Sequence, residues 1–105
     1  MGYIYIITNK NNDKVYIGQT SRTIEERWKE HLLSYQDEAK KHYKLYAAMN
    51  KYGIDSFSIG KIEQCDLEKL NEREQYWINR FDSYINGYNM TIGGDGIQTA
   101  CVEKI

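Results

Sequence analysis

The sequence predicts a small mixed α/β (α+β) domain with an N-terminal β-hairpin, one further strand and three helices. Two observations lead to this prediction: short segments rich in β-branched and aromatic residues read as strands, and three longer segments repeat apolar residues at helical spacing. With 105 residues, of which 41% are hydrophobic and 28% charged, the chain has room for one core. We expect one domain over residues 1–92 and a glycine-rich flexible tail over residues 93–105.

The hairpin prediction rests on the first twenty residues. Two segments rich in β-branched and aromatic residues, 2–8 and 14–18, flank the polar run 9–13. Asn and Asp in that run tolerate the positive φ angles of a tight connection. An even-numbered loop puts Tyr5 and Tyr16 on the same face of the hairpin, and an odd-numbered loop puts them on opposite faces. The residues alone leave this parity open, and the ordinary interpretation is that both tyrosines pack with their hydroxyls at the rim.

The next segment predicts a helix ending near Tyr35, with Thr23 or Ser21 as its N-cap and two glutamates in its first turn. The residues of its apolar stripe are Ile24, Trp28, Leu32 and Tyr35. Arg27 and His31 lie at i and i+4 beside this stripe and share the edge of the buried face. On an arbitrary helix these two residues form a surface cation pair, so their chemistry depends on what else converges there.

Three later segments are assigned to secondary structure from their patterns. Residues 42–52 repeat apolar side chains at helical spacing and precede Gly53, which suits a C-terminal cap. We expect this second helix to be purely structural. Residues 57–62 alternate apolar and polar side chains, as a strand with one covered face does. Residues 83–92 predict a turn and a short extended segment, and the glycines that follow lack the Gly-Lys-Ser/Thr ending of a phosphate-binding loop.

A third helix is predicted from an N-cap at Asp66 to about Phe81, and Glu74 is its most informative residue. The residues of its apolar stripe are Leu67, Leu70, Trp77, Ile78 and Phe81. Glu74 falls in the middle of this stripe, so its carboxylate points toward the core. A buried ionised carboxylate is costly unless it is paired, protonated or bound to a metal. A buried Glu–Arg pair and a functional carboxylate both fit this pattern.

Composition excludes several classes of protein. A net charge of −1 argues against a strongly basic nucleic-acid coat. Residues 1–51 carry nine basic against six acidic side chains, and residues 52–105 carry five against nine, so any phosphate-facing surface is expected in the first half. No apolar run approaches the roughly 18 residues of a membrane-spanning helix. Cys65 and Cys101 lack metal-ligand spacing, and a cytoplasmic protein without membrane contact is expected.

Several short motifs occur along the chain in one order. They are the tripeptides Tyr3-Ile4-Tyr5 and Tyr16-Ile17-Gly18, Arg27 with His31 on one helix, Glu74 on a later helix, and Asn89 near the end. This ordered set resembles the GIY-YIG nuclease superfamily over roughly residues 2–92, and as a set it is specific. Tyr3 stands where the first motif has its glycine, with Gly2 one position earlier. The run Gly87-Tyr88-Asn89 before the glycines is most similar to the phage and intron homing branch.

The resemblance implies a three-stranded antiparallel sheet flanked by helices, with Tyr5 and Tyr16 on one face beside Arg27, His31 and Glu74. It implies cleavage of double-stranded DNA by attack of water on a phosphodiester, with one divalent ion, Mg²⁺ or Mn²⁺, per active site. Glu74 would hold this ion, because such hard cations take oxygen ligands and keep several waters.

The resemblance also assigns roles to the other motif residues. One of Tyr5 and Tyr16 would take a proton from the attacking water while the other contacts the phosphate, although a phenol with an ordinary pKa near 10 needs that pKa lowered or its proton relayed. Arg27 would neutralise the phosphate, and His31 would move a proton or bind phosphate. The supporting residues are Asn89, which would orient its neighbours by hydrogen bonds, and Gly18.

The function that the resemblance implies is a metal-dependent DNA endonuclease domain of the homing or mobile-element type. A restriction role or a repair and recombination role competes with it, and a nuclease-like fold that binds nucleic acid without cutting is the alternative of a different class. The presence of Glu74 and Arg27 favours the enzyme. The sequence shows no helix-turn-helix, zinc finger or basic arm, so we expect weak, salt-sensitive DNA binding and target choice by a separate module or partner. A monomer or a transient dimer is expected.

Overall fold

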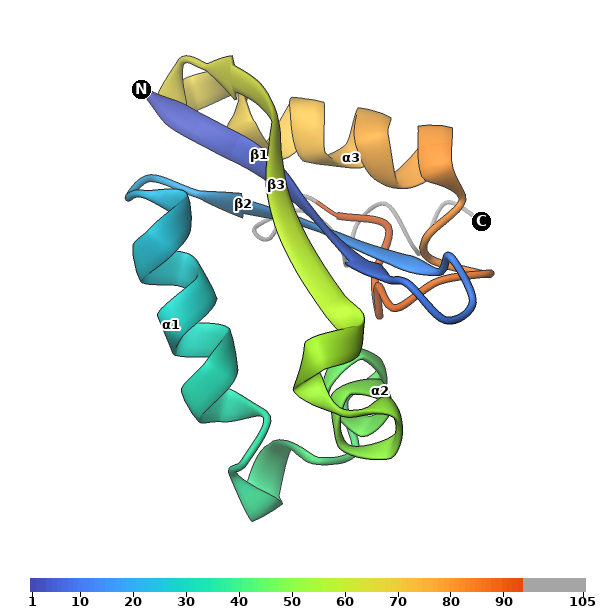
Figure 1. Cartoon of the computed structure of the whole chain (residues 1–105). Coiled ribbons are helices and arrows are strands. Elements are labelled where there is room, and N and C mark those ends of the chain that lie inside the picture. The colour runs from blue at the N-terminus through green and yellow to red at the C-terminus, as the bar shows by residue number, and fades with distance from the viewer. Residues whose placement is uncertain (94–105) are drawn as a thin grey trace.

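The computed structural model describes residues 1–93, which form a three-stranded antiparallel sheet and three α-helices (Figure 1). The elements are β1 (Gly2–Asn9), β2 (Val15–Thr20), α1 (Ile24–Ser34), α2 (Lys44–Tyr52), β3 (Phe57–Cys65) and α3 (Leu70–Phe81). The strand order is β2-β1-β3, so β2 is an edge strand. The predicted fold class is confirmed.

The hairpin places the two motif tyrosines on one face of the sheet. Tyr5 pairs across the ladder with Gly18, and Tyr16 pairs with Ile7, two residues along β1 from Tyr5. Because side chains alternate between faces, Tyr5, Ile7 and Tyr16 share a face. The loop is even-numbered, and Asp13 in it has a φ of 63°. The residues alone left open whether Tyr5 and Tyr16 share a face. The structure shows that they do, as the resemblance implied.

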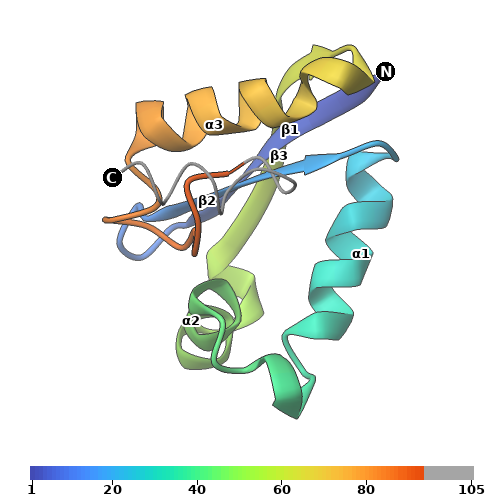
Figure 2. The same ribbon diagram turned by 180° about the vertical axis from the view of Figure 1, so that it is seen from behind.

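The helices cover both faces of the sheet, with α1 and α2 on one side and α3 on the other (Figures 1 and 2). The core on the α1 and α2 side contains Tyr5, Ile7, Leu45, Met49, Phe57 and Tyr88. The core on the α3 side contains Ile4, Val15, Ile17, Leu70 and Ile78. Successive residues of β1 and β2 thus pack into two separate cores, one on each face of the sheet. The outer edge of β2 lies between these two cores.

The helix ends largely follow the sequence signals. Thr23 is the N-cap of α1, and it forms a capping box with Glu26. Gly53 ends α2 with a φ of 89°, as predicted, although α2 begins at Lys44 and not at residue 42. A 3₁₀ turn over Leu67–Lys69 precedes α3, so the α-helix begins later than the predicted cap at Asp66.

Strand β3 runs three residues beyond the predicted 57–62. It pairs with β1 over its whole length, and Gly2 lies opposite Cys65. An irregularity in this pairing at Ile4 and Tyr5 shifts the register by one residue. Such a bulge breaks the alternation of side chains, which is why the period-2 pattern ends early.

The segment after α3 contains no strand within the described residues, contrary to the predicted short extended segment. Asp82 ends α3 in the left-handed conformation, with a φ of 53°, and the chain then turns back along the outer edge of β2. There the Tyr88 N–H donates to the Val15 carbonyl at 2.9 Å. Side chains complete this contact, so no regular ladder forms.

The predicted flexible tail lies outside the described residues except for Gly93, and so does Cys101. Gly93 is buried, and its carbonyl accepts a hydrogen bond from Gln75 on α3. Over residues 1–93, no helix has the length and apolar character needed to cross a membrane.

Candidate active site

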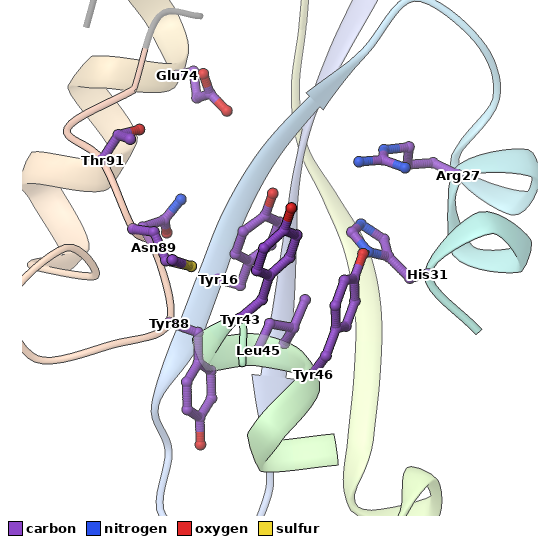
Figure 3. Close-up of a pocket in the computed structure, with 11 residues that line it drawn as sticks. Tyr16, Arg27, His31, Tyr43, Leu45, Tyr46, Glu74, Tyr88, Asn89 and Thr91 are labelled. Atoms are coloured by element: carbon purple, nitrogen blue, oxygen red, sulfur yellow. The ribbon is translucent and has the colours of Figure 1, made fainter. Parts of the chain in front are cut away.

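A cavity of about 490 Å³ opens beside the edge strand β2, between α1, the start of α2 and the segment after α3 (Figure 3). The residues that line it are Tyr16, Arg27, His31, Tyr43, Leu45, Tyr46, Glu74, Tyr88, Asn89, Met90 and Thr91. All of the predicted site residues except Tyr5 and Gly18 are among them.

Tyr5 lies beneath this cavity and is fully buried. Its phenol crosses the backbone of Gly18, where an added Cβ would lie 2.3 Å from the Tyr5 Cζ atom. The Tyr5 hydroxyl is 2.8 Å from His31 Nε2. Tyr5 therefore meets Tyr16 and His31 on one face of the sheet, as the resemblance implied, but it does not line the cavity itself, because glycine at position 18 lets its ring pack against the β2 backbone.

His31 is the most deeply buried residue of α1, with 1% of its surface exposed. Its two ring nitrogens each lie 2.8 Å from a phenol oxygen, Nε2 from Tyr5 and Nδ1 from Tyr46. Burial, helped by the nearby Arg27 charge, lowers the pKa of His31 to about 3. His31 is therefore neutral at physiological pH, and the interpretation of Arg27 and His31 as a surface cation pair is wrong.

The buried neutral His31 is expected to make the stability of the domain fall as the pH is lowered. Unfolded histidine binds a proton near pH 6.5, whereas folded His31 does so only near pH 3, so the unfolded state binds more protons between these values. The free energy of unfolding should drop by about 2 kcal/mol from this group between pH 6.5 and 5.

Urea unfolding at pH 7 and pH 5 measures this contribution. The variant His31→Phe should lose it, and His42→Gln, a change at the exposed second histidine, should keep it. An equal pH dependence in wild type and His31→Phe would contradict a neutral, buried His31.

Tyr16 presents its phenol to the cavity from β2. Its ring meets that of His31 edge to face, with centroids 5.6 Å apart. Burial, followed by the negative charge of Glu74, raises the pKa of Tyr16 to about 12, and the Arg27 guanidinium opposes this rise. Burial also raises the pKa of Tyr5. Both phenols are therefore protonated at neutral pH, and Tyr16 needs added positive charge nearby to act as a base.

Arg27 supplies a fixed positive charge on the α1 side of the cavity (Figure 3). Its Nη1 atom donates to Glu30 at 2.9 Å, and Glu30 also pairs with Arg22. Glu30 thus bridges two arginines, of which Arg27 lines the cavity. A guanidinium has five donors, so one contact with Glu30 leaves others for an anionic oxygen.

Glu74 reaches the cavity from α3, past the edge of β2, and only 7% of its surface is exposed. The predicted burial of this carboxylate is confirmed. Gln19 on β2 orients it, because the Gln19 amide donates to Glu74 Oε1 at 2.9 Å and to Asn71 at 2.8 Å. Arg73, the preceding residue on α3, pairs with Glu63 on β3.

Asn89 completes the hydrogen bonds of the edge strand. Its amide nitrogen donates to the Ile17 carbonyl and its amide oxygen accepts from the Ile17 N–H, both at 2.8 Å. Ser83 also donates to that oxygen at 2.7 Å. The side chain of Asn89 therefore replaces a residue of a fourth strand, and it orients its neighbours as predicted.

Three residues of the site were not singled out from the sequence. Gln19 orients Glu74, Tyr46 contacts His31, and Lys44 donates to the Asn89 carbonyl at 3.3 Å. Tyr46 and Lys44 lie on α2, so this helix, predicted from the sequence to be purely structural, contributes side chains beside the cavity. The only sequence signal was the position of Tyr46 next to the apolar stripe of that helix, which alone does not distinguish a site residue from a core residue.

The donors around the cavity fit one hard cation. Within residues 1–93 no group of three or more His, Cys, Asp and Glu side chains is placed to hold a metal. These residues therefore do not form a metal site in which the protein supplies all the ligands. Glu74 is a carboxylate that lines an open cavity. Mg²⁺ is commonly bound by one or two carboxylates, with waters and substrate phosphate as its other ligands.

The fold and this arrangement of a carboxylate, a guanidinium and a phenol beside an open cavity define a nuclease-type catalytic domain. The chain belongs to the GIY-YIG family: the family model described as the GIY-YIG catalytic domain matches residues 1–89. The resemblance seen in the sequence is therefore confirmed.

Similar proteins place the chain near the homing endonucleases. Intron-associated endonuclease 1 of Enterobacteria phage T4 is 38% identical over 89 residues, which cover 83% of this chain and 36% of that protein. Uncharacterized protein 019R of Invertebrate iridescent virus 6 is 40% identical over 94 residues, which cover 85% of this chain and 33% of that protein. The chain thus spans about a third of the length of these relatives.

A solved structure shares the fold. The catalytic domain of the homing endonuclease I-TevI matches with a TM-score of 0.75 and 34% sequence identity, over 85% of this chain and 97% of that one. The chain is thus a GIY-YIG nuclease domain related to homing endonucleases.

Proposed function

We propose that this domain is a metal-dependent DNA endonuclease that hydrolyses a phosphodiester bond, and that it is of the homing or mobile-element type. The observation that supports this proposal best is the placement of Glu74 and Arg27 on opposite sides of one cavity, with Tyr16 between them (Figure 3). A carboxylate that can hold a cation and a guanidinium that can bind a phosphate oxygen thus face the same space.

Glu74 would hold one Mg²⁺ or Mn²⁺, with Gln19 fixing the orientation of the carboxylate. Such a cation supplies positive charge that polarises the scissile phosphate and stabilises the leaving oxygen. On the other side, Arg27 binds a phosphate oxygen with the donors that Glu30 does not occupy.

Tyr16 is the residue that we assign to proton transfer from the attacking water. It lines the cavity, whereas Tyr5 does not. The positive charge of Arg27 lowers the pKa of Tyr16, in opposition to burial, and a bound divalent cation acts in the same direction. His31 is neutral, so it takes part through hydrogen bonds and not as a cation that binds phosphate.

Sequence choice would come from outside this domain. The match covers only 36% and 33% of the length of two relatives, and the chain carries a net charge of −1. Few phosphates are then neutralised, so binding to duplex DNA should be weak and should weaken further with salt. One active site cuts one DNA strand at a time, so a double-strand break needs a transient dimer or successive nicks. The proposed substrate is cytoplasmic double-stranded DNA.

Nicking of supercoiled plasmid tests this proposal. Nicked and then linear product should form with added Mg²⁺ or Mn²⁺, and an excess of EDTA should stop it. Product that forms equally well in EDTA would overturn the metal dependence. Plasmid that stays intact with either ion, under conditions where the protein still shifts duplex DNA in a gel, would favour the alternative of a binding domain that does not cut.

A further inference from the structure

A second cavity, of about 400 Å³, adjoins the active-site cavity at Arg27, which lines both. It lies where β2 leads into α1, and residues 19–22 and Glu30 form much of its lining. Gln19, which orients Glu74 through a 2.9 Å hydrogen bond, is among them. A molecule bound between Arg27 and Glu74 can therefore extend into this second cavity, to which the proposed function gives no role.

Two contacts fix Arg22 at the second cavity. Its backbone N–H donates to Oγ1 of the buried Thr20 at 3.0 Å. Its guanidinium pairs with Oε2 of Glu30, whose Oε1 accepts from Arg27 at 2.9 Å. The two oxygens of one carboxylate thus hold two guanidinium groups next to each other. Arg27 lines both cavities, and Arg22 lines the second.

The second cavity carries a net positive charge. The charged side chains that line it are two arginines and one glutamate. The two glutamates in the first turn of α1 are occupied elsewhere, because Glu26 forms the capping box with Thr23 and Glu25 lines a separate cavity with Lys61. The second cavity therefore favours an anion.

Arg22 has donors available for such an anion. Its side chain is 51% exposed, and a guanidinium has five donors, so the contact with Glu30 leaves others open to a ligand. The proposed function places the scissile phosphate beside Arg27. A DNA strand carries one phosphate per roughly 3.4 Å of helix axis, so the next phosphate lies close to the scissile one. Arg22, held beside Arg27 by Glu30, is in position to bind it, and the planar fork of a guanidinium suits phosphate oxygens.

We propose that the second cavity binds the phosphate next to the scissile one on the same DNA strand, and that Arg22 is the residue that contacts it. The position of this phosphate relative to the cleaved bond rests on the proposed function. The contact between Arg22 and duplex DNA does not, because binding requires no cleavage.

Fluorescence anisotropy of a labelled duplex, measured in EDTA at several salt concentrations, tests the contact without cleavage. Arg22→Gln should weaken binding roughly fivefold to tenfold and should reduce the slope of log affinity against log salt by about 0.9, the share of one phosphate. Arg22→Lys keeps the charge and should keep the slope.

The matched control is Arg80→Gln, the same change at an exposed arginine on α3 that lines neither cavity. It should alter affinity and slope much less than Arg22→Gln does. Circular dichroism of each variant checks that the fold is retained. Equal effects of the two glutamine variants would overturn the proposal, because Arg22 would then form only a surface ion pair with Glu30.

A double-mutant cycle with Glu30→Gln separates direct contact from an effect passed on to Arg27. If Arg22 binds phosphate itself, Arg22→Gln should weaken binding with and without the Glu30 carboxylate. If Arg22 acts only by fixing Glu30, the loss should disappear in the Glu30→Gln protein. The second result would overturn the contact.

Plasmid nicking with Mg²⁺ then tests the position of the phosphate. The phosphate next to the scissile one keeps its charge throughout the reaction, so loss of its contact should raise KM by the factor seen in binding and should appear in KM more than in kcat. A fall in kcat with KM unchanged would place Arg22 at the scissile phosphate and overturn the proposal. A wild-type protein that cuts no plasmid would overturn the proposed function, and the measurements in EDTA would still decide whether Arg22 contacts DNA.

Discussion

Glu74→Gln is expected to abolish metal-dependent nicking of plasmid DNA while leaving the fold of the domain intact. The amide has the shape of the carboxylate and keeps an oxygen that can accept from Gln19. It lacks the negative charge that holds a hard cation. Loss of the several kcal/mol that such a cation contributes to the reaction corresponds to about a thousandfold fall in rate.

The stability of this variant separates a functional carboxylate from a structural one. If the charge of Glu74 serves metal binding, the free energy of unfolding should change by less than about 1 kcal/mol. Breaking a buried ion pair costs about 3–5 kcal/mol by contrast. Glu72→Gln, an exposed change on the same helix, is the control and should leave both nicking and stability as they are. Wild-type nicking by a folded Glu74→Gln protein would remove the carboxylate from the mechanism.

Local sequence signals were sufficient for much of the fold. Helical spacing placed all three helices, and the carboxylate at Glu74 stood out because a charged residue interrupted an apolar stripe. These features depend on residues within a few turns of each other. The same holds for the Thr23 capping box and the Gly53 cap.

Features that depend on non-local packing could not be predicted in the same way. The burial of His31 follows from two phenols that lie 26 and 15 residues away in the chain. Helical spacing placed this residue at an edge, because it says nothing of what α1 packs against. The pairing of Asn89 with Ile17 spans 72 residues and replaces a strand by one side chain, which no period in the sequence reveals.

The parity of the hairpin shows what the resemblance added. The polar run alone allowed either face for Tyr16, and the superfamily motif implied the face that the ladder has. The motif did not imply that one of its two tyrosines would be covered. That outcome depends on the register, which puts Gly18 directly opposite Tyr5.

Gly18→Ala is expected to destabilise the domain strongly and to separate Tyr5 from His31. The new Cβ would lie 2.3 Å from two atoms of the buried Tyr5 phenol, so the ring must move. Overpacking of this kind costs about 1–3 kcal/mol, and the displaced buried hydrogen bond adds about 1–3 kcal/mol. A loss of about 3 kcal/mol would lower the Tm of a domain of this size by roughly 10–20 °C.

Gly60→Ala is the matched control on β3 of the same sheet. An added Cβ at Gly60 has no atom within 4 Å, and its φ is compatible with alanine. Glycine in a strand carries an entropic cost, so this change should leave the Tm unchanged or raise it slightly. In thermal unfolding, Gly18→Ala should therefore lower the Tm, and Gly60→Ala should leave the Tm unchanged or raise it.

Removal of the Tyr5 ring tests the cause of the Gly18 effect. In a Tyr5→Leu protein the ring that the new Cβ would strike is absent, so Gly18→Ala should cost much less there than in the wild type. Side chains in direct contact are coupled in this way, whereas separated sites contribute independently. An equal loss of Tm from Gly18→Ala with and without the Tyr5 ring would show that the strand tolerates alanine poorly for another reason, and Gly18 would then not be the residue that lets Tyr5 pack beneath the cavity.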